Sequence, residues 1–211
     1  MMPDLSKIYD AAFFAEWGPA NAAYLHTARL IAKTLAQEFR PKRIADLGCG
    51  CGVYAHAFAA QGIEALALDG VKPPPEHSFP VKIETRDLTV PFDNVWGDFD
   101  FALCLEVAEH IPQEKAGVFL DNLLKFSGTL VLSAAPPNQG GHHHVNEQPR
   151  RYWAGLLAAK GYDYRRQRTG RLLQALSEQK PDYMWMVNHI AVYEKTPSSR
   201  KAKPFATPAN S

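Results

Sequence analysis

Short apolar runs alternate with amphipathic stretches through most of the chain. Ile44, Ala45 and Leu47 form one such run, and residues 53–60 then carry apolar side chains at helical spacing. Further apolar runs follow at residues 64–68, 81–85, 99–105 and 129–133. Runs of this length predict strands that are covered on both faces. Because strands and helices alternate, the pattern predicts right-handed crossovers and a parallel sheet in an α/β domain.

The part of the chain before the first strand predicts an N-terminal helical segment, residues 1–40, packed on this domain. Residues 19–38 place apolar side chains at helical spacing and predict an amphipathic helix against the sheet. A cluster of aromatic residues precedes this helix and consists of Tyr9, Phe13, Phe14 and Trp17. We interpret the cluster as part of a docked helix, with a lid over a ligand site as the alternative.

The pattern changes toward the C-terminus. Residues 162–169 and 184–195 read as strands, separated by a helical turn, and predict a terminal antiparallel pair. A single domain is therefore expected over residues 1–195. Residues 196–211 are rich in Pro, Ser, Ala and Lys and predict a disordered C-terminal tail.

Three alternating glycines, Gly48, Gly50 and Gly52, directly follow the first predicted strand. Glycine lacks a Cβ, so the backbone here can turn sharply and lie close against a ligand. The free N–H groups at the start of the next helix face the same crevice and suit an anionic or polar group. The spacing indicates a nucleotide-type cofactor site, although a turn that only joins strand and helix also accommodates these glycines.

Acidic residues stand at or near the carboxyl ends of the first four predicted strands: Asp46, Asp69, Asp87 and Glu106. Ligands of open parallel sheets bind at this edge. Asp69 lies about as far beyond the glycines as the acid that meets a cofactor ribose, and its carboxylate can accept hydrogen bonds from two vicinal hydroxyls. The acids therefore strengthen the interpretation of the glycine turn as part of a cofactor site.

The motif DLGCGCG, the acid at Asp69, the Asp87-Leu88 pair and the run FDFALCLEVAEHIP together resemble the S-adenosylmethionine-dependent methyltransferases of the seven-stranded, Rossmann-like class. The segment SAAPPNQGGHHHVNEQ, with a Tyr-Trp pair after it, is similar to a group of small bacterial and phage methyltransferases. The resemblance implies a three-layer α/β/α sandwich with a mostly parallel seven-stranded sheet whose last strand is antiparallel. It also implies S-adenosylmethionine as the cofactor.

The resemblance further implies a cofactor-binding role for each residue of the matching motifs. The glycines would border the methionine portion, Asp69 would hold the ribose hydroxyls, Asp87 with Leu88 would flank the adenine, and Glu106 would lie beside the sulfonium pocket. The complete cofactor-binding set expected on this basis is Asp46, Gly48, Gly50, Gly52, Asp69, Asp87, Leu88 and Glu106.

The stretch EVAEHIP carries candidate chemistry. Glu106, Glu109 and His110 stand at relative positions zero, three and four, so a helical turn would point all three to one side. In some RNA-terminal methyltransferases, an ExxEH stretch and a later histidine bind a divalent metal, whereas in other relatives Glu106 lines the cofactor pocket and His110 caps the loop beneath it. We expect no metal here and keep the metal site as the alternative.

A histidine run lies in residues 140–147, after the fifth predicted strand and therefore at the same edge of the sheet. Among His142, His143 and His144, the family pattern aligns with the last, which we expect to serve as a base. His144, His110 and Glu109 are thus the candidate catalytic residues. The alternative is that His144 only pins a loop by hydrogen bonds.

Composition and charge limit the binding partners that we expect. Charged residues make up 21% of the chain and the formal net charge is +1, so bulk attraction to nucleic acid or membrane is not indicated. The densest basic stretch, residues 150–171, is interpreted as a solvated face. Trp153 and Trp185 are expected in the core. No leading charged-then-apolar segment and no membrane-length apolar run are present, and the cysteines number three, so we expect a cytoplasmic protein with reduced thiols.

These features lead to one hypothesis and three alternatives. We expect a methyltransferase that moves a methyl group from S-adenosylmethionine to an oxygen or nitrogen of a small-molecule or sugar-like acceptor. A metal-assisted RNA 2′-O-methyltransferase is the first alternative, and with it nucleic acid stays open as a partner. A nicotinamide-dependent oxidoreductase would share the strand, the glycines and Asp69, but favours GxGxxG over alternating glycines. A cofactor-binding module without turnover is the third alternative.

Overall fold

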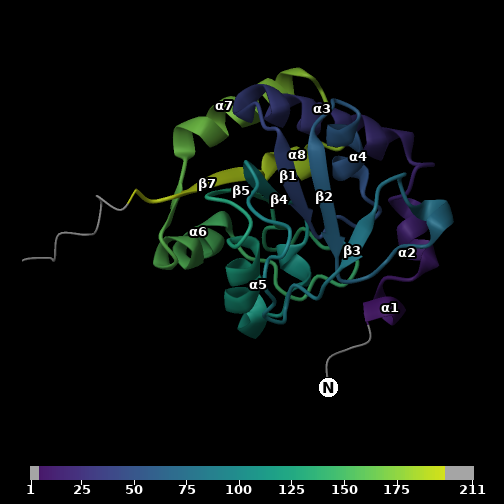
Figure 1. Ribbon diagram of the computed structural model, residues 1–211, viewed down its shortest axis with the longest axis horizontal. Coiled ribbons are helices and arrows are strands. Elements are labelled where there is room, and N and C mark those ends of the chain that lie inside the picture. Colours follow the sequence, from purple (N-terminus) through teal and green to yellow (C-terminus); the bar gives the residue numbers. More distant parts are fainter. Residues whose placement is uncertain (1–4, 198–211) are drawn as a thin grey trace, which may run out of the picture.

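The computed structural model describes residues 5–197 and places one seven-stranded sheet between two layers of helices (Figure 1). The strand order is β3-β2-β1-β4-β5-β7-β6, and β7 runs antiparallel to both of its neighbours while the other pairs are parallel. The predicted fold class is therefore confirmed. The strands are β1 (Arg43–Leu47), β2 (Glu64–Asp69), β3 (Ile83–Thr85), β4 (Phe101–Cys104), β5 (Thr129–Leu132), β6 (Tyr162–Tyr164) and β7 (Ala191–Lys195).

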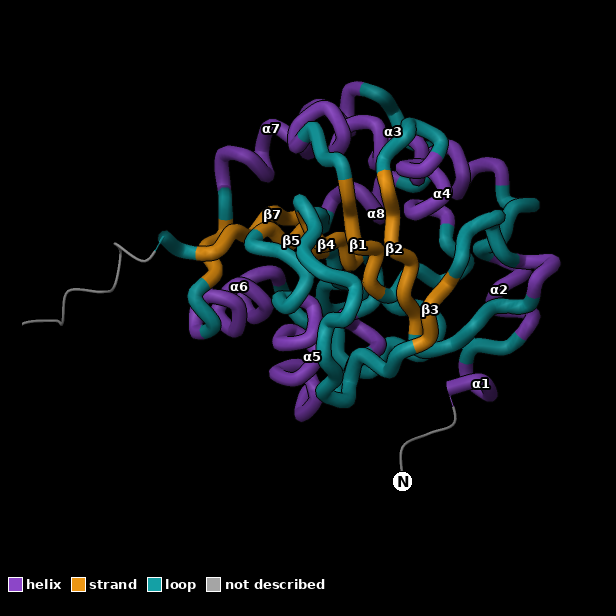
Figure 2. The backbone as a smooth tube through the Cα atoms, in the orientation of Figure 1, coloured by secondary structure: helices purple, strands orange, loops and turns teal. Residues whose placement is uncertain are grey.

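The helices cover both faces of the sheet, as Figure 2 shows. One face carries α3 (Ala22–Phe39), α4 (Val53–Ala59), α7 (Arg166–Glu178) and α8 (Met184–Asn188). The opposite face carries α5 (Ala116–Leu123) and α6 (Arg150–Ala159). Two short helices, α1 (Leu5–Ile8) and α2 (Ala11–Glu16), and short 3-10 helices at Pro75–His77, Ala108–His110 and Gln113–Lys115 complete the described elements.

Each layer has its own apolar core. On the α3 side, Phe58 of α4 packs edge-on against Phe101 of β4, with ring centroids 5.8 Å apart. On the α5 side, Phe119 and Trp153 pack beneath the same sheet. Because β1, β4 and β5 contribute buried residues to both layers, their sequences read as nearly continuous apolar runs, which is why the sequence predicted them.

The helix predicted at residues 19–38 is α3, shifted slightly toward the C-terminus. Asn21 caps its start, because the Asn21 Oδ1 accepts a hydrogen bond from the backbone N–H of Tyr24 at 2.9 Å. Its end is set by Arg40, which takes a left-handed conformation at φ 47° and turns the chain toward β1.

The prediction for the C-terminal region was partly wrong. Only residues 162–164 and 191–195 form strands, and the intervening chain holds two helices, α7 and α8. In α7, Thr169, Leu172 and Leu176 are buried at intervals of three and four residues, so helical periodicity governs this segment. The predicted tail, residues 196–211, lies almost entirely outside the described residues.

The topology fixes where a ligand site lies. β1 has β2 on one side and β4 on the other, so the chain leaves the carboxyl end of β1 at the point where the strand order reverses. Residues 5–197 contain no helix that is both long and apolar enough to cross a bilayer. All three cysteines are free and buried.

Candidate functional site

Two neighbouring cavities open at the carboxyl ends of β1, β2 and β4. The first has a volume of about 180 Å³ and the second a volume of about 540 Å³. Gly48, Gly50 and Glu106 line both cavities, so the glycine loop and one acid stand where the two spaces meet. The arrangement therefore offers a place for two ligands side by side.

The first cavity contains the acids expected to hold an adenosyl group. Asp69 accepts hydrogen bonds from the backbone N–H of Gly50 at 2.8 Å and of Val71 at 2.9 Å. Burial raises the pKa of Asp69, and these backbone bonds act against the rise. Asp87 accepts from the backbone N–H and the hydroxyl of Thr89, both at 2.7 Å. Each carboxylate retains lone pairs for a ligand hydroxyl or amine.

Two positions of the loop require glycine for different reasons. At Gly48, φ is 82° and a Cβ would lie 2.5 Å from Cγ2 of Val107, so a side chain has no room. At Gly50, φ is 52°, but a Cβ would have no atom within 4 Å and would project into open space. Gly48 is therefore required for close packing, whereas Gly50 lets the backbone turn beside the cavities.

Asp46 and Gly52 lie behind the two cavities, and their expected contact with a cofactor stays a prediction. Asp46 is 2% exposed, and its Oδ2 accepts a hydrogen bond from the backbone N–H of Ala55 at 3.1 Å. Burial raises the pKa of Asp46 to about 7. A Cβ on Gly52 would lie 2.5 Å from Cγ2 of Val81. Neither residue lines a cavity in the described chain, so both support the loop from beneath.

Glu106 is held at the junction by an unusual backbone. Its φ is 56°, a left-handed conformation that costs a non-glycine residue about 1–2 kcal/mol. The Ser133 hydroxyl donates to Glu106 Oε1 at 2.6 Å and accepts from the Glu106 backbone N–H at 3.0 Å. Gln139 donates to the other carboxylate oxygen at 3.4 Å. Strain of this kind, fixed by its surroundings, is characteristic of functional positions.

Glu109 lies at the base of the second cavity without a hydrogen-bond partner for its side chain. This side chain is fully buried, and neither carboxylate oxygen has a hydrogen bond. Burial and the nearby Glu106 raise the pKa of Glu109 well above its usual range. The Glu109 carbonyl accepts from the backbone N–H groups of Val145 at 3.0 Å and Asn146 at 2.9 Å, which joins the two motif segments.

The expected catalytic residues converge on this cavity. Glu106, Glu109 and His110 all line it, and so does His144 from the later loop. The His110 and His144 rings meet edge-on with centroids 4.9 Å apart, and burial lowers the pKa of His110 to about 4. Ligand atoms of Glu109, His110 and His144 all lie within 4.8 Å of one another. One carboxylate and two imidazoles are a donor set that fits a divalent transition metal.

His144 has a partner that sequence reasoning missed. Glu147 Oε1 accepts from His144 Nδ1 at 2.9 Å and from the Gly140 backbone N–H at 2.6 Å, while Oε2 accepts from the Asn138 backbone N–H at 2.8 Å. The bond from His144 lowers the pKa of Glu147. Because a carboxylate only accepts, Nδ1 of His144 carries the proton and Nε2 is left as an acceptor. The spacing of three residues between His144 and Glu147 was the available signal.

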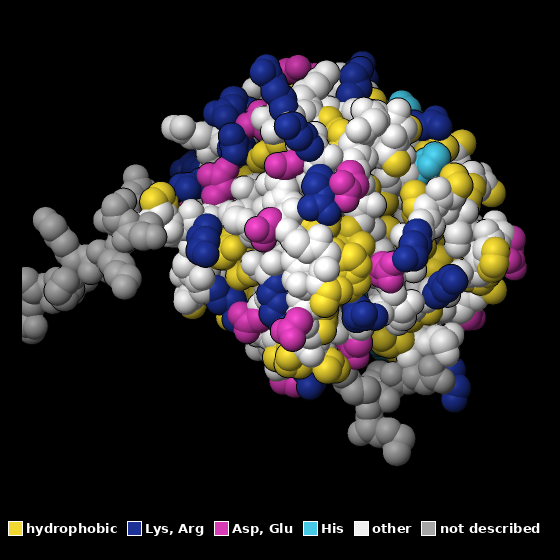
Figure 3. Space-filling view, in the orientation of Figure 1, with side chains coloured by type: hydrophobic (Ala, Val, Ile, Leu, Met, Phe, Trp, Pro, Cys, Tyr) yellow, Lys and Arg dark blue, Asp and Glu magenta, His cyan; other side chains and the backbone are white. Residues whose placement is uncertain are grey.

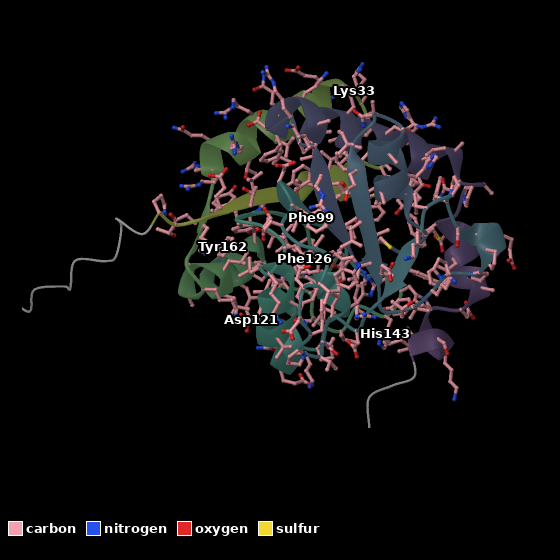
Figure 4. The ribbon with its side chains drawn as sticks, viewed as in Figure 1. Lys33, Phe99, Asp121, Phe126, His143 and Tyr162 are labelled. Atoms are coloured by element: carbon pink, nitrogen blue, oxygen red, sulfur yellow. The ribbon has the colours of Figure 1, made fainter. Side chains whose placement is uncertain are left out.

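The N-terminal helices contact the histidine loop. His142 Nε2 lies 2.7 Å from the carbonyl oxygen of Ile8, and the His142 ring packs on Phe13 with centroids 5.1 Å apart. Tyr9 meets the rings of His110 and His143 edge-on. Figure 4 labels His143 beside α1. The aromatic cluster predicted upstream of α3 therefore borders both cavities, and its function as a lid stays a prediction.

The expectations for the two tryptophans had different outcomes. Trp153 is 2% exposed and belongs to the core, as predicted. Trp185 is 37% exposed and lines the second cavity, so its assignment to the core was wrong. The reason is the local fold, because residues 184–188 form α8 instead of an interior strand and turn this side chain toward the cavity.

The comparisons with known proteins agree with this fold. A family model described as a methyltransferase domain matches residues 20–169, more than half of the chain. A ubiquinone biosynthesis O-methyltransferase of Acinetobacter baylyi is 27% identical over 131 residues, which cover 56% of this chain and 50% of that protein. The chain spans about half the length of the curated relatives it matches.

Solved methyltransferase structures share the fold. The 1,6-didemethyltoxoflavin-N1-methyltransferase of Burkholderia thailandensis, solved with 1,6-didemethyltoxoflavin and S-adenosylhomocysteine, has a TM-score of 0.57 at 16% identity, covering 92% of this chain and 90% of that chain. The plantazolicin methyltransferase BpumL, solved with S-adenosylhomocysteine, has a TM-score of 0.58 at 14% identity, covering 92% of this chain and 91% of that chain.

The chain belongs to the methyltransferase domain family, and its fold is that of the class I, Rossmann-like methyltransferases. Enzymes of this class use S-adenosylmethionine as the methyl donor, as expected from the motifs. The family match thus selects a methyltransferase over the nicotinamide-dependent oxidoreductase.

Proposed function

We propose that this protein transfers the methyl group of S-adenosylmethionine to an oxygen or nitrogen of a small-molecule acceptor, with sugar-like compounds among the candidates. The observation that carries the proposal is the second cavity of about 540 Å³, which adjoins the glycine loop and contains a carboxylate-oriented histidine. A cavity of this size suits a small molecule better than a polymer.

The first cavity has the polar groups that an adenosyl cofactor requires. Asp69 would hold the ribose hydroxyls, Asp87 and Leu88 would border the adenine, and Glu106 would lie beside the sulfonium. Among the described residues that line it, none is a lysine or arginine. Carboxylates without a cation favour a positively charged sulfonium and disfavour the pyrophosphate of a dinucleotide.

When bound, S-adenosylmethionine supplies an electrophilic methyl group. Gly48 and Gly50 would let the methionine portion lie against the backbone, and Glu106 would orient the sulfonium toward the second cavity. His144 Nε2 would accept the proton that the acceptor oxygen or nitrogen loses as its bond to the methyl carbon forms. Glu147 would stabilise the resulting imidazolium through the Nδ1–H bond.

The decisive experiment is a transfer assay with radiolabelled cofactor and a metabolite extract. We expect the His144→Ala variant to bind S-adenosylhomocysteine normally and to transfer methyl groups about 10²- to 10⁴-fold more slowly. His26→Ala is the matched control and is expected to retain most activity, because His26 pairs with Asp182 and lines neither cavity. Equal rates for His144→Ala and the wild type would reject a catalytic role. A protein that binds cofactor and never methylates any acceptor would instead be a binding module.

The cluster of Glu109, His110 and His144 favours a second candidate, a metal-assisted RNA 2′-O-methyltransferase. These residues would hold a divalent cation, which would polarise a ribose hydroxyl. The basic stretch argues against an RNA substrate, because Arg168 pairs with Glu38 and Glu194, and Arg165 pairs with Glu194. Figure 3 shows basic and acidic side chains intermixed over α3 and α7. Loss of activity with a chelator and its recovery with added metal would support this candidate.

A further inference from the structure

Six aromatic rings contribute to the walls of the second cavity. They come from three separate parts of the chain: the N-terminal helices, the helix after the glycine loop and the C-terminal α8. Trp17 and Tyr24 meet edge-on with centroids 5.3 Å apart, and Trp17 and Trp185 do so at 6.1 Å. The aromatic residues that line the cavity are Phe13, Phe14, Trp17, Tyr24, Tyr54 and Trp185.

Trp185 is the outermost of these rings. Its side chain is 37% exposed, and it meets Trp17 edge-on and Tyr183 at a tilt, so none of its described aromatic neighbours stacks on the ring. Exposed aromatic surface at the mouth of a cavity is typical of a ligand-binding position. Aromatic faces bind planar rings more strongly than area alone accounts for.

The charges around the cavity restrict the acceptor further. Glu16, Glu106 and Glu109 line it, whereas its described lining contains no lysine or arginine. An anionic acceptor would find no lysine or arginine there as a counter-charge, which is unfavourable in a partly desolvated site. The acceptor is therefore uncharged or cationic at its buried end.

The base of the cavity offers acceptors for hydrogen bonds. Both carboxylate oxygens of the fully buried Glu109 lack partners, and Nε2 of His144 is free to accept from a ligand. A buried polar group without a partner is costly, so a ligand that donates hydrogen bonds here would stabilise the site. Two neighbouring hydroxyl or amino groups on one ring edge match this demand.

From these observations we infer that the acceptor is a planar aromatic compound without an anionic group, carrying hydroxyl or amino donors on the edge that faces Glu109 and His144. The inference rests on the proposed methyltransferase function and narrows its acceptor. Trp17 and Trp185 contact the ring, and Glu109 binds its donors. A sugar-like acceptor fits less well, because it lacks the planar π-face that would pair with the six aromatic rings of the wall.

The test is calorimetric titration of the full chain, saturated with S-adenosylhomocysteine, with three probes. Catechol is an uncharged aromatic diol, 3,4-dihydroxybenzoate adds a carboxylate, and methyl β-glucoside replaces the ring by a sugar. We expect catechol to bind with a Kd of about 1 mM or tighter, as for a fragment of its size. The benzoate is expected to bind about tenfold more weakly, and the glucoside to give no heat.

A pair of variants ties binding to the cavity. Trp185→Leu is expected to weaken catechol binding by about tenfold without changing the affinity for S-adenosylhomocysteine. Trp96→Leu is the matched control, because Trp96 stacks on Phe126 on the other side of the sheet and lines neither cavity. Its affinity for catechol is expected to equal that of the wild type.

The outcomes separate the two proposals. Failure to bind S-adenosylhomocysteine would overturn the methyltransferase function itself. If S-adenosylhomocysteine binds, the acceptor inference is overturned by any of three results: catechol does not bind, the glucoside or the benzoate binds as tightly as catechol, or Trp185→Leu leaves catechol binding unchanged.

Discussion

Replacing Glu147 by glutamine measures what its negative charge contributes to proton transfer. The wild-type carboxylate holds three donors: His144 Nδ1, and the backbone N–H groups of Gly140 and Asn138. The single amide oxygen of glutamine can keep the first two, because one carboxylate oxygen accepts both. The amide NH₂ then faces the Asn138 N–H, and that bond is lost. The variant keeps the His144 tautomer and removes the charge beside its ring.

The magnitude follows from the bonds that change. A hydrogen bond to a charged group contributes about 1.5–3 kcal/mol, against about 0.5–1.5 kcal/mol for a neutral one. The imidazolium formed during transfer therefore loses about 1.5 kcal/mol of stabilisation, which lowers kcat by about tenfold. The lost Asn138 bond loosens the loop, so the decrease extends toward a hundredfold. Because Glu147 lines neither cavity, the affinity for S-adenosylmethionine is expected to be unchanged.

The assay compares kcat and KM of Glu147→Gln and the wild type. The decrease is expected in kcat, with KM for S-adenosylmethionine unchanged, because Glu147 lines neither cavity. Glu114→Gln serves as the control, since Glu114 is exposed and lines neither cavity. An unchanged kcat, or a rise in KM for S-adenosylmethionine as large as the fall in kcat, would refute the reasoning.

Four further substitutions test the cofactor side and the backbone that supports it. Asp69→Ala is expected to weaken S-adenosylhomocysteine binding by about 1.5–3 kcal/mol in calorimetry, because ribose hydroxyls lose a charged acceptor; equal affinity would reject the assignment. Gly48→Ala is expected to lower the melting temperature, because its Cβ would lie 2.5 Å from a Val107 methyl group at a φ of 82°; Gly117→Ala in α5 has open space and is expected to raise it. Burial raises the pKa of Asp46 to about 7, so Asp46 binds its proton more tightly in the folded state than in the unfolded state. The free energy of unfolding therefore falls as pH rises from about 4 to 7, by up to about 4 kcal/mol. Asp46→Asn is expected to match the wild type in thermal unfolding near pH 4 and to be more stable at pH 8; parallel pH curves would contradict this.

Much of the fold follows from patterns that act locally. The strand at Arg43–Leu47 is apolar because both of its faces are covered, and the glycines after it mark a sharp turn that leaves room for Val107. Asp69 and Glu106 were located correctly at the edge of the sheet, since parallel strands bring their carboxyl ends together.

The remaining features depend on contacts between distant parts of the chain. Trp185 was assigned to the core because its neighbours are apolar, but α8 turns it into a cavity shared with Trp17, which no local pattern reveals. In the sequence, Asp46 resembles the other acids at strand ends. In the structure its side chain accepts a hydrogen bond from the backbone N–H of Ala55, in the first turn of α4. Residues 166–169 were predicted as strand but belong to helix α7, because Thr169 is the first of its residues buried at helical spacing.

The central claim is that the cavity between Asp69, Asp87 and the glycine loop binds the adenosyl half of a methyl donor. Calorimetric titration of the purified chain with S-adenosylhomocysteine tests it most directly, with NADH as the comparison ligand. We expect one site with a Kd in the range of about 1 µM to 1 mM for S-adenosylhomocysteine and no binding of NADH. Absence of heat with both S-adenosylhomocysteine and S-adenosylmethionine, or preferential binding of NADH, would contradict the account.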